Sequence, residues 1–314
     1  MISIVVPLYN EEESIEIFYK ELVSELKTLS LQHEIIFIDD GSIDKSLLIL
    51  KKIAEADKKT TIFSFRKNIG KSEALTFGFQ KAKGEYIITL DADLQDRPSQ
   101  IVKLIKKAQE GYDVVTGWRK ERKDSSIKIL SSKLFNFLAN RLWKLDLHDY
   151  NCGLKLYAKD AAKSLSLYGG MHRFIPLLLA QKGFVITEIS VDHATRRFGK
   201  SKYGISKLWK DLPDIFTMIF LTKYSQCPLH FFAPIGGMLF IIGFIILAYL
   251  TIIHFQGYAI GRRPLLFLGM LLVLSSLQVI FTGFLADLII NISKNQHSEY
   301  QDESVLLKYS NEEK

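Results

Sequence analysis

The chain has 314 residues, of which 48% are hydrophobic and 24% charged, and it contains only two cysteines, Cys152 and Cys227. This composition excludes an intrinsically disordered chain and a disulfide-stabilised scaffold, and two such widely separated cysteines argue against a metal cluster. The charge is uneven, because residues 1–223 carry 36 basic and 28 acidic side chains, whereas residues 224–314 carry 5 and 6. A basic part joined to long apolar stretches excludes a purely soluble chain and predicts action at an anionic membrane surface.

Short apolar strands alternate with amphipathic helices over the first 120 residues. The predicted strands are Ile2–Val6, Glu34–Ile38, Thr61–Phe65, Tyr86–Leu90 and Asp113–Thr116, and the helices between them are Glu11–Leu29, Asp44–Ala56, Lys71–Lys83 and Pro98–Gln109. Because no basic residue precedes the first apolar run, we interpret it as a buried strand and not as a signal peptide. Continuous apolar strands separated by helices predict an α/β fold with a parallel sheet covered on both faces.

Polar or charged residues follow every one of these strands. The segments are 7–11, 39–42, 66–71, 91–96 and 117–119. Open parallel sheets bind ligands at the carboxyl ends of their strands, where these five segments are expected to meet. The sequence therefore predicts a site for phosphate, ribose or a metal ion at this edge.

The most informative of these segments is Asp91-Ala92-Asp93, which follows the apolar strand that ends at Leu90. In extended chain, residues two apart point to the same side, so the two carboxylates are expected to face one spot. Their mutual repulsion favours a cation between them. Mg²⁺ typically binds one or two carboxylates together with substrate phosphates, so Asp91 and Asp93 are predicted to hold a metal ion and a diphosphate.

Two amphipathic segments and a basic loop follow. Residues 125–147 form a basic amphipathic helix, either packed on the sheet or lying at lipid headgroups. A helix and a further strand are predicted within 172–190, and a loop rich in Arg, Gly and Lys within 192–204. The segment 205–221 is a second amphipathic stretch, and it is predicted to lie in the membrane interface.

Two apolar segments are long enough to cross a membrane. Leu229–Phe255 spans roughly 40 Å as a helix, and 265–292 is similar. The short connection 256–264 makes the pair an antiparallel hairpin. Five lysines before the hairpin (Lys200, Lys202, Lys207, Lys210 and Lys223) outnumber Arg262 and Arg263 of its turn, which predicts a cytoplasmic N-terminal part. The expected organisation is a catalytic domain at 1–204, an interfacial region at 205–224, a transmembrane hairpin at 225–292 and a polar cytoplasmic tail at 293–314.

Four motifs carry a resemblance to a known family. IVVPLYNEEESI (4–15), IIFIDDGSIDKS (35–46), RKNIGKSEAL (66–75) and IITLDADLQDRP (87–98) resemble the family-2 inverting glycosyltransferases of the GT-A fold. Within that family the chain is most similar to the dolichyl- or polyprenyl-phosphate hexosyltransferases, the dolichol-phosphate mannose synthase group. The resemblance covers essentially residues 2–204, and the hairpin resembles that of bacterial membrane-anchored members. It implies a Rossmann-like, mostly parallel GT-A domain followed by interfacial amphipathic helices and two transmembrane helices.

The resemblance also implies roles for the residues that follow the first, second and fourth strands. The residues expected to hold the nucleotide and its diphosphate here are Pro7, Tyr9, Glu11, Asp39 or Asp40, Asp91, Ala92 and Asp93. One of the pair Asp39 and Asp40 is expected to accept the N–H of the base. Glu11 has a second interpretation as part of an acidic cluster that complements the dipole of the following helix.

The basic loop resembles the family's Arg-x-x-Gly-x-Ser-Lys pattern when Gly199 and Ser201 are matched. This match makes Arg196 and Lys202 the cations that neutralise the diphosphate as it leaves, with Arg119 assisting. Binding of the loop to lipid headgroups is the alternative.

Asp149 lies where the family keeps its presumed catalytic carboxylate, so the resemblance implies Asp149, Asp93 and Arg196 as catalytic residues. Asp149 is expected to take a proton or to orient sugar hydroxyls, and the alternative is a turn residue. His172 and Arg173 are interpreted either as ligands of an acceptor phosphate or as structural residues.

The activity implied is an inverting, Mg²⁺- or Mn²⁺-dependent transfer of a hexose from a UDP- or GDP-sugar to a polyprenyl phosphate. A bacterial type of hairpin favours UDP. The alternatives are transfer to another membrane lipid or lipid-linked saccharide, and a non-catalytic nucleotide-sugar sensor or scaffold. Membrane lipids and a second copy of the chain are further expected partners, whereas nucleic acid is not, because the Lys and Arg residues are not interleaved with aromatics.

Overall fold

The computed structural model describes residues 1–29, 31–120, 145–194, 227–261 and 263–309, together with 136, 139–141, 143, 217 and 220–224. The chain divides into two compact units, Met1–Asp214 and Ile215–Lys314. The predictions for most of the 125–147 helix, for the basic loop from residue 195 and for the interfacial segment 205–216 lie outside the described residues.

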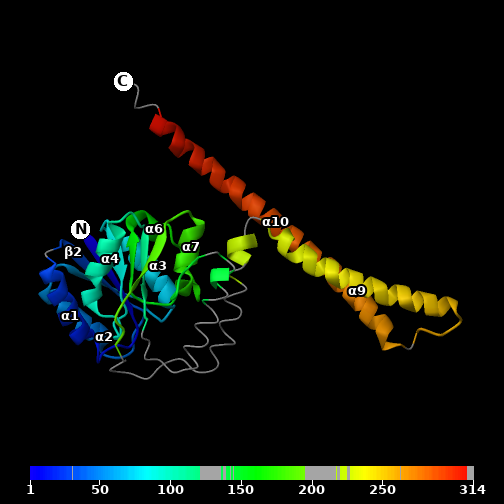
Figure 1. Ribbon diagram of the computed structural model, residues 1–314, viewed down its shortest axis with the longest axis horizontal. Helices are drawn as coiled ribbons and strands as arrows, with labels where there is room; N and C mark the ends of the chain where they lie inside the picture. The colour runs from blue at the N-terminus through cyan, green and yellow to red at the C-terminus, as the bar shows by residue number, and fades with distance from the viewer. Residues whose placement is uncertain are drawn as a thin grey trace. The chain divides into compact units, whose positions relative to one another are not determined.

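The described part of the first unit is built on a seven-stranded sheet (Figure 1). Its strands are β1 (Ile2–Leu8), β2 (His33–Asp39), β3 (Thr60–Ser64), β4 (Tyr86–Thr89), β5 (Val114–Trp118), β6 (Lys155–Ala158) and β7 (Ile186–Ser190). They are arranged in the order β3-β2-β1-β4-β6-β5-β7. Every pairing is parallel except those of β6, which runs antiparallel to both β4 and β5.

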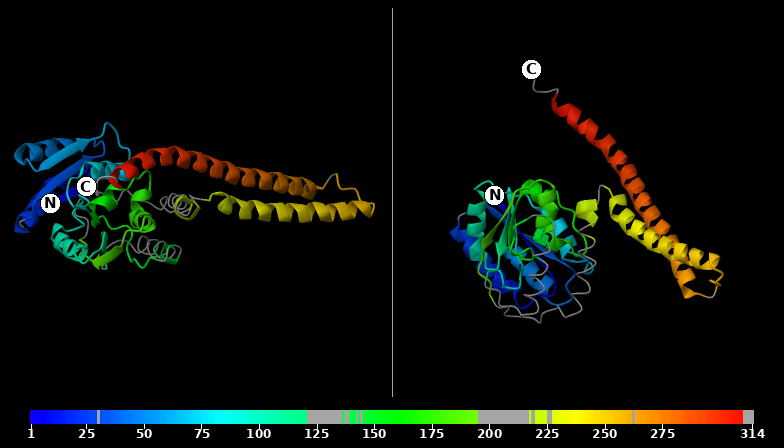
Figure 2. Two further views of the ribbon diagram at one scale, coloured as in Figure 1. Left: turned by 90° about the horizontal axis from the view of Figure 1, so that it is seen from above. Right: turned by 45° about the vertical axis from the view of Figure 1, so that its right-hand side comes forward.

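Helices cover both faces of this sheet (Figures 1 and 2). They are α1 (Ile15–Thr28), α2 (Ser46–Ala56), α3 (Lys71–Lys81), α4 (Ile101–Ala108), α6 (Lys159–Lys163) and α7 (Ile175–Gln181), with short 3-10 turns η1 (Pro98–Gln100) and η2 (Met171–Arg173). Successive side chains of β1 point to opposite faces of the sheet, so both faces are apolar and each is covered by a layer of helices. Ile4 and Val6 share a buried cluster with α1, α2 and α4, whereas Val5 lies against α3 at Gly78.

The predicted sheet is confirmed as mostly parallel, with one strand that the sequence pattern did not reveal. β6 is only four residues long and begins with a lysine, so its sequence KLYA lacks the continuous apolar run of the other strands. Because β6 runs antiparallel, its amino end lies at the edge where the parallel strands end. The loop before β6 is therefore brought to the predicted ligand edge.

The first helix begins later than predicted. α1 starts at Ile15 and not at Glu11, because the backbone of residues 9–14 forms a turn in which Asn10 adopts a φ of 55°. This turn leaves Tyr9 and Glu11 at the carboxyl edge of the sheet.

The second unit contains a short π-helix, η3 (Phe220–Tyr224), and the two long helices α9 (Leu229–Phe255) and α10 (Pro264–Tyr309). Leu229–Phe255 and Pro264–Ile290 have mean hydropathies of 2.5 and 2.3 and are long and apolar enough to cross a membrane. The two helices pack closely, since a Cβ at Gly243 would lie 3.0 Å from the carbonyl oxygen of Gly269. The two predicted membrane helices are therefore present, and α10 continues into the predicted polar tail (Figure 2).

Candidate functional site

The loops that follow β1, β2 and β3 are tied together at the carboxyl edge of the sheet. The backbone N–H of Asn10 donates to the Ser42 hydroxyl (2.9 Å), and the Asn10 side-chain oxygen accepts from the N–H of Ile43 (2.9 Å). Gly41 has a φ of 70°, and a Cβ there would lie 2.4 Å from the backbone of Lys67. Only glycine fits both this backbone conformation and this close approach. The three loops therefore form one continuous surface.

Pro7, Tyr9 and Glu11 lie at the start of this surface. Pro7 is buried within β1, and Tyr9 and Glu11 are half-buried in the turn after it. The Ser14 hydroxyl donates to the Glu11 carboxylate (3.0 Å) just before α1 begins, and both interpretations of Glu11 stay open. The expected contacts of these three residues with a nucleotide stay a prediction.

Asp39 and Asp40 are both buried and both bind the protein's own loops. Asp39 accepts from the N–H of Ser42 (3.1 Å) and from the Ser64 hydroxyl (2.7 Å). Asp40 accepts from the N–H of Ile69 (2.8 Å) and of Gly70 (3.0 Å). Burial raises the pKa of Asp40 despite these bonds. Asp40 holds the loop that leads into α3, whereas Asp39 holds the loop after β2 and the end of β3. The choice between them as the partner of a base stays open.

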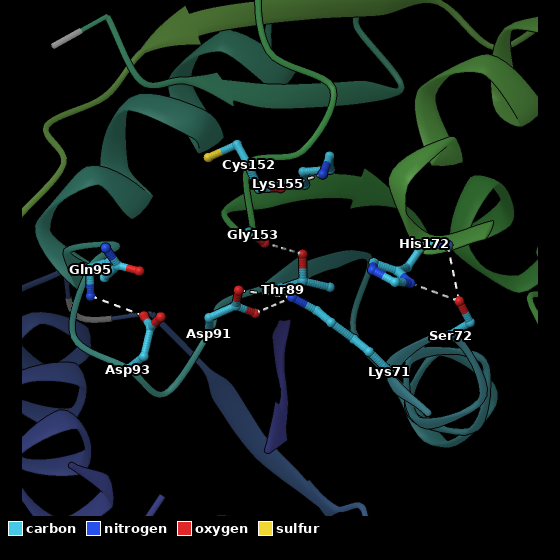
Figure 3. A network of polar contacts seen from close by, with 10 residues as sticks. All are labelled: Lys71, Ser72, Thr89, Asp91, Asp93, Gln95, Cys152, Gly153, Lys155 and His172. Carbon is cyan, nitrogen blue, oxygen red and sulfur yellow. Dashed lines mark hydrogen bonds and ion pairs between the residues drawn. The ribbon is translucent and has the colours of Figure 1, made fainter. Parts of the chain in front are cut away.

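Asp91 and Asp93 do not point to one spot as neighbours in extended chain would. β4 ends at Thr89, and residues 92–93 lie in a turn, so the premise of a continuing strand is wrong. The Asp91 carboxylate faces the Lys71 ammonium, with distances of 2.6 and 2.8 Å from Nζ to its two oxygens. Asp93 accepts from the backbone N–H of Gln95 (3.1 Å), and Figure 3 shows the two side chains turned in different directions. Ala92 between them is buried, so its expected contact with a diphosphate stays a prediction.

A third carboxylate, Asp96, completes this part of the edge. A Cβ on Gly153 would lie 2.7 Å from the Asp91 carboxylate and 2.8 Å from Oδ2 of Asp96, so both side chains converge on that glycine. Oδ1 of Asp96 is buried and lacks a hydrogen-bond partner among the described residues. Burial, together with the charges of Asp91 and Asp93, raises the pKa of Asp96 to about 7.

This set of carboxylates fits a hard divalent cation that is held only in part by the protein. The unsatisfied Asp96 oxygen and the mutual repulsion of three acids are the features that a cation relieves. No group of three His, Cys, Asp or Glu side chains in the described ranges is close enough to hold a metal ion by itself. Oxygen atoms of a bound diphosphate and water supply the remaining ligands in Mg²⁺ sites of this kind.

Arg119 and Asp149 form a buried ion pair at the same edge. Nε and Nη2 of Arg119 donate to the two oxygens of Asp149 at 2.7 and 3.0 Å, and the N–H of Asn151 donates to Asp149 as well (3.0 Å). The Asp149 side chain is only 2% exposed and that of Arg119 12%. In this geometry Asp149 orients Arg119, and both of its carboxylate oxygens are occupied.

Lys155 and His172 line the same small pocket as Asp91. Lys155, at the start of β6, is buried and donates to the carbonyl oxygen of Cys152, and no carboxylate in the described residues forms an ion pair with it. Burial lowers the pKa of Lys155. His172 contacts the Ser72 hydroxyl through Nδ1 (3.0 Å), and burial lowers its pKa to about 3, so its ring is neutral. A neutral ring held by Ser72 favours the structural interpretation of His172 over a role in binding phosphate.

Three residues of this edge were not predicted as site residues: Lys71, Asp96 and Lys155. Lys71 and Asp96 occur within motifs that were recognised, in segments 66–71 and 91–96, so their position after a strand was an available signal. Lys155 belongs to a strand that the sequence pattern did not reveal. The predicted cations Arg196 and Lys202 lie outside the described residues.

The chain leading to those cations is nevertheless anchored at the edge. Asp96 and His193 form an isolated antiparallel β-bridge, and the N–H of Ala194 donates to the carbonyl oxygen of Gln95 (3.0 Å). Arg196 follows two residues later in the sequence. The motif 91–96 and the start of the basic loop are therefore neighbours in space.

Comparison with protein families and with curated proteins gives consistent matches. The family model described as Glycosyl transferase family 2 matches residues 3–166. Dodecaprenyl-phosphate galacturonate synthase of Rhizobium johnstonii is 36% identical over 296 residues, which cover 92% of this chain and 87% of that protein. Undecaprenyl-phosphate 4-deoxy-4-formamido-L-arabinose transferase of Photorhabdus laumondii is 33% identical over 291 residues, which cover 92% and 88%.

Solved structures with the same fold include glucosyl-3-phosphoglycerate synthase of Mycobacterium tuberculosis. Its complex with phosphoglyceric acid matches with a TM-score of 0.55 and 18% identity, over 71% of this chain and 79% of that chain. Its complex with Mn²⁺ and uridine-diphosphate-glucose matches with a TM-score of 0.52 and 18% identity, over 71% and 78%. The mostly parallel GT-A sheet predicted from the motifs is therefore confirmed.

Proposed function

The chain belongs to glycosyl transferase family 2, and from this premise we propose that it transfers a sugar from a nucleotide-sugar to a polyprenyl phosphate. The observation that carries the proposal is the extent of the match to the two relatives described above. Both matches cover 92% of this chain, and both relatives are named for a polyprenyl-phosphate product or acceptor. A likeness of this length includes residues of both the sheet domain and the apolar helices.

The donor site is the carboxyl edge of the sheet. Asp91 and Asp93, with Asp96 next to Asp91, are proposed to offer carboxylate oxygens to Mg²⁺ or Mn²⁺ without enclosing it, and a bound ion would neutralise negative charge on the diphosphate. The complex of the mycobacterial enzyme with Mn²⁺ and uridine-diphosphate-glucose, which shares this fold, supports such a pairing of ion and donor. Tyr9, Glu11 and one of Asp39 and Asp40 are proposed to hold the nucleoside, with Pro7 shaping the turn.

The leaving diphosphate needs positive charge where its own negative charge develops. Arg119 is held in a fixed orientation by Asp149 at this edge and is proposed to serve this purpose. Arg196 and Lys202 are proposed to add to it, because their loop begins next to Gln95 and Asp96. We therefore keep Arg196 as a proposed catalytic cation, and Asp93 as a proposed catalytic residue through the metal ion.

Asp149 is proposed to position Arg119 and not to act as a base. A phosphate monoester acceptor is already largely ionised near neutral pH, so an inverting attack on the anomeric carbon does not require a strong base. Both Asp149 oxygens already accept hydrogen bonds from Arg119. The expected function of Asp149 as a proton acceptor is therefore the less favoured interpretation.

The sugar is proposed to be a hexose or a related pentose. One relative is named for galacturonate and the other for an arabinose derivative, so the relatives do not favour one ring type. UDP is the preferred nucleotide, and GDP is the alternative.

The two apolar helices are proposed to anchor the enzyme in the cell membrane with the sheet domain on the cytoplasmic side. The excess of lysine before the hairpin supports this orientation. Such an anchor keeps the soluble domain near the lipid whose phosphate it uses. Transfer to another membrane lipid or lipid-linked saccharide is the second candidate, because an anchor of this kind suits any lipid acceptor.

The decisive experiment uses the purified full chain in detergent with Mg²⁺ or Mn²⁺, undecaprenyl phosphate and a panel of UDP-glucose, UDP-galacturonate and GDP-mannose. The expected result is release of nucleotide that depends on the acceptor, with a polyprenyl-phosphate-linked sugar detected by mass spectrometry. Undecaprenol, which lacks the phosphate, is the matched control acceptor. Tight donor binding without product would contradict transfer and support a nucleotide-sugar sensor.

A further inference from the structure

The ion pair between Lys71 and Asp91 occupies the carboxylate that a metal ion needs. Lys71 is the first residue of α3, and its Nζ lies 2.6 and 2.8 Å from the two Asp91 oxygens. Both oxygens face the ammonium (Figure 3). The side chains keep 35% and 32% of their surface exposed, so a ligand from solvent can reach the pair. An ion that binds Asp91 must therefore displace or share the lysine.

The surroundings make a simple loss of the ammonium unfavourable. Asp91 and Asp96 both lie against Gly153, and their like charges repel when Asp91 loses its counter-ion. Lys71 in turn lies near the buried Lys155, whose like charge makes a nearby anion favourable when the ammonium moves away from Asp91. Two replacements therefore favour each other: a cation for Asp91 and an anion beside Lys71.

A divalent ion alone supplies only the first replacement, and a diphosphate alone supplies only the second. A nucleoside diphosphate with its bound ion supplies both, and the exchange then leaves no charge without a partner. The Lys71 ammonium and a divalent ion would bind the same two oxygens of Asp91. The two cations therefore compete for this carboxylate.

We propose that Lys71 is a positioning residue that neutralises Asp91 until the donor arrives, so that the divalent ion binds weakly by itself and tightly with the diphosphate. The diphosphate part of this inference rests on the proposed nucleotide-sugar donor, whereas the competition between Lys71 and the ion does not. Two ligands that relieve the same charge imbalance must raise each other's affinity by the same factor.

The test measures Mn²⁺ binding to the full chain in detergent, by electron paramagnetic resonance of free Mn²⁺, with no nucleotide present. Lys71→Met removes the ammonium while keeping the length of the side chain, and we expect its affinity for Mn²⁺ alone to rise about tenfold, within the usual range of coupling between sites. Lys71→Arg retains the charge and is expected to keep the weak binding. Lys58→Met, an exposed lysine in the turn before β3 and so at the opposite end of that strand from the site, is the matched control for net charge and is expected to change nothing.

The second measurement repeats the titration with saturating UDP. We expect UDP to tighten Mn²⁺ binding to the unmodified chain about tenfold or more, and to tighten it clearly less in Lys71→Met. Equal affinity of the unmodified chain and Lys71→Met for Mn²⁺ alone would overturn the inference. If Lys71→Met does not fold, as judged by circular dichroism, the unmodified chain still decides, because Mn²⁺ binding that is equally tight with and without UDP contradicts the proposal.

The two proposals fail separately. Lack of transfer with every donor and acceptor contradicts the proposed function, while tighter Mn²⁺ binding by Lys71→Met supports the competition at Asp91 whatever reaction the site performs.

Discussion

Two ion pairs lie at the carboxyl edge of the sheet, and they differ in nearly every physical respect. Arg119 and Asp149 are buried, with 12% and 2% of their side chains exposed, and are joined by two parallel hydrogen bonds. Lys71 and Asp91 are about one-third exposed, and a single ammonium faces both carboxylate oxygens. A buried bidentate pair is expensive to break, whereas an accessible pair exchanges its partners readily. The edge thus combines a fixed cation with a carboxylate that is able to change partner.

The largest effect is expected from breaking the fixed pair. Asp149→Asn leaves the Arg119 charge buried without its counter-ion, which typically costs about 3–5 kcal/mol of folding free energy. The measurement is thermal unfolding of the full chain in detergent, where we expect a marked drop in Tm. The double variant Arg119→Met with Asp149→Asn is the control and is expected to recover part of the loss, because it removes the buried charge. An unchanged Tm in Asp149→Asn would mean that the pair is not buried in solution.

We expect the folding stability to depend on pH through Asp96, whose pKa is affected by the charges of both Asp91 and Arg119. Its pKa is raised to about 7 by burial and by Asp91 and Asp93, from an ordinary value of 3.8. The folded state therefore binds a proton that the unfolded state releases, so the stabilising contribution is present below about pH 4 and is lost as the pH rises through about 7. At about 1.4 kcal/mol for each pKa unit, the change reaches up to roughly 4 kcal/mol.

Asp96→Asn mimics the protonated acid and tests this expectation. With EDTA present, we expect the variant and the unmodified chain to have similar Tm values at about pH 4 or below, and the variant to become the more stable as the pH rises to about 7. Parallel Tm curves across this range would contradict a raised pKa at Asp96.

A substitution of Asp93 tests whether the carboxylates near the Lys71–Asp91 pair are needed for sugar transfer. Asp93→Ala removes one oxygen donor of the proposed metal and diphosphate site, and we expect transfer to fall by about 100-fold or more with the fold intact. The assay is acceptor-dependent nucleotide release, with circular dichroism as the control for folding. Turnover close to that of the unmodified chain would count against the metal role of Asp93.

The smallest effect on stability is expected from the exchangeable pair itself. Lys71→Met should change the folding free energy by about 1 kcal/mol or less, because exposed ion pairs contribute little. The measurement is again Tm in detergent, beside that of Asp149→Asn. Comparable losses in the two variants would remove the distinction between the two pairs.

Much of the fold and part of the site were predictable from the sequence. Six of the seven strands, the ligand edge and the two long apolar helices follow from local apolar patterns, and the aspartates 39, 40, 91 and 93 follow from their place after a strand. The direction of the Asp91 and Asp93 side chains was not predictable in this way. Their orientation depends on where β4 stops, and the strand ends before the motif begins.

The sequence by itself determined the classes of segment: apolar strands, amphipathic helices, membrane spans and the acidic and basic residues at the strand ends. These features depend on residues that are close together in the sequence, so their spacing can be read from the sequence directly. Only the tertiary structure decided that β6 runs antiparallel, that Asp149 orients Arg119 and that Lys71 occupies Asp91. Each of the two ion pairs joins residues 20 or 30 positions apart, and such pairs form only after the strands have been ordered in the sheet.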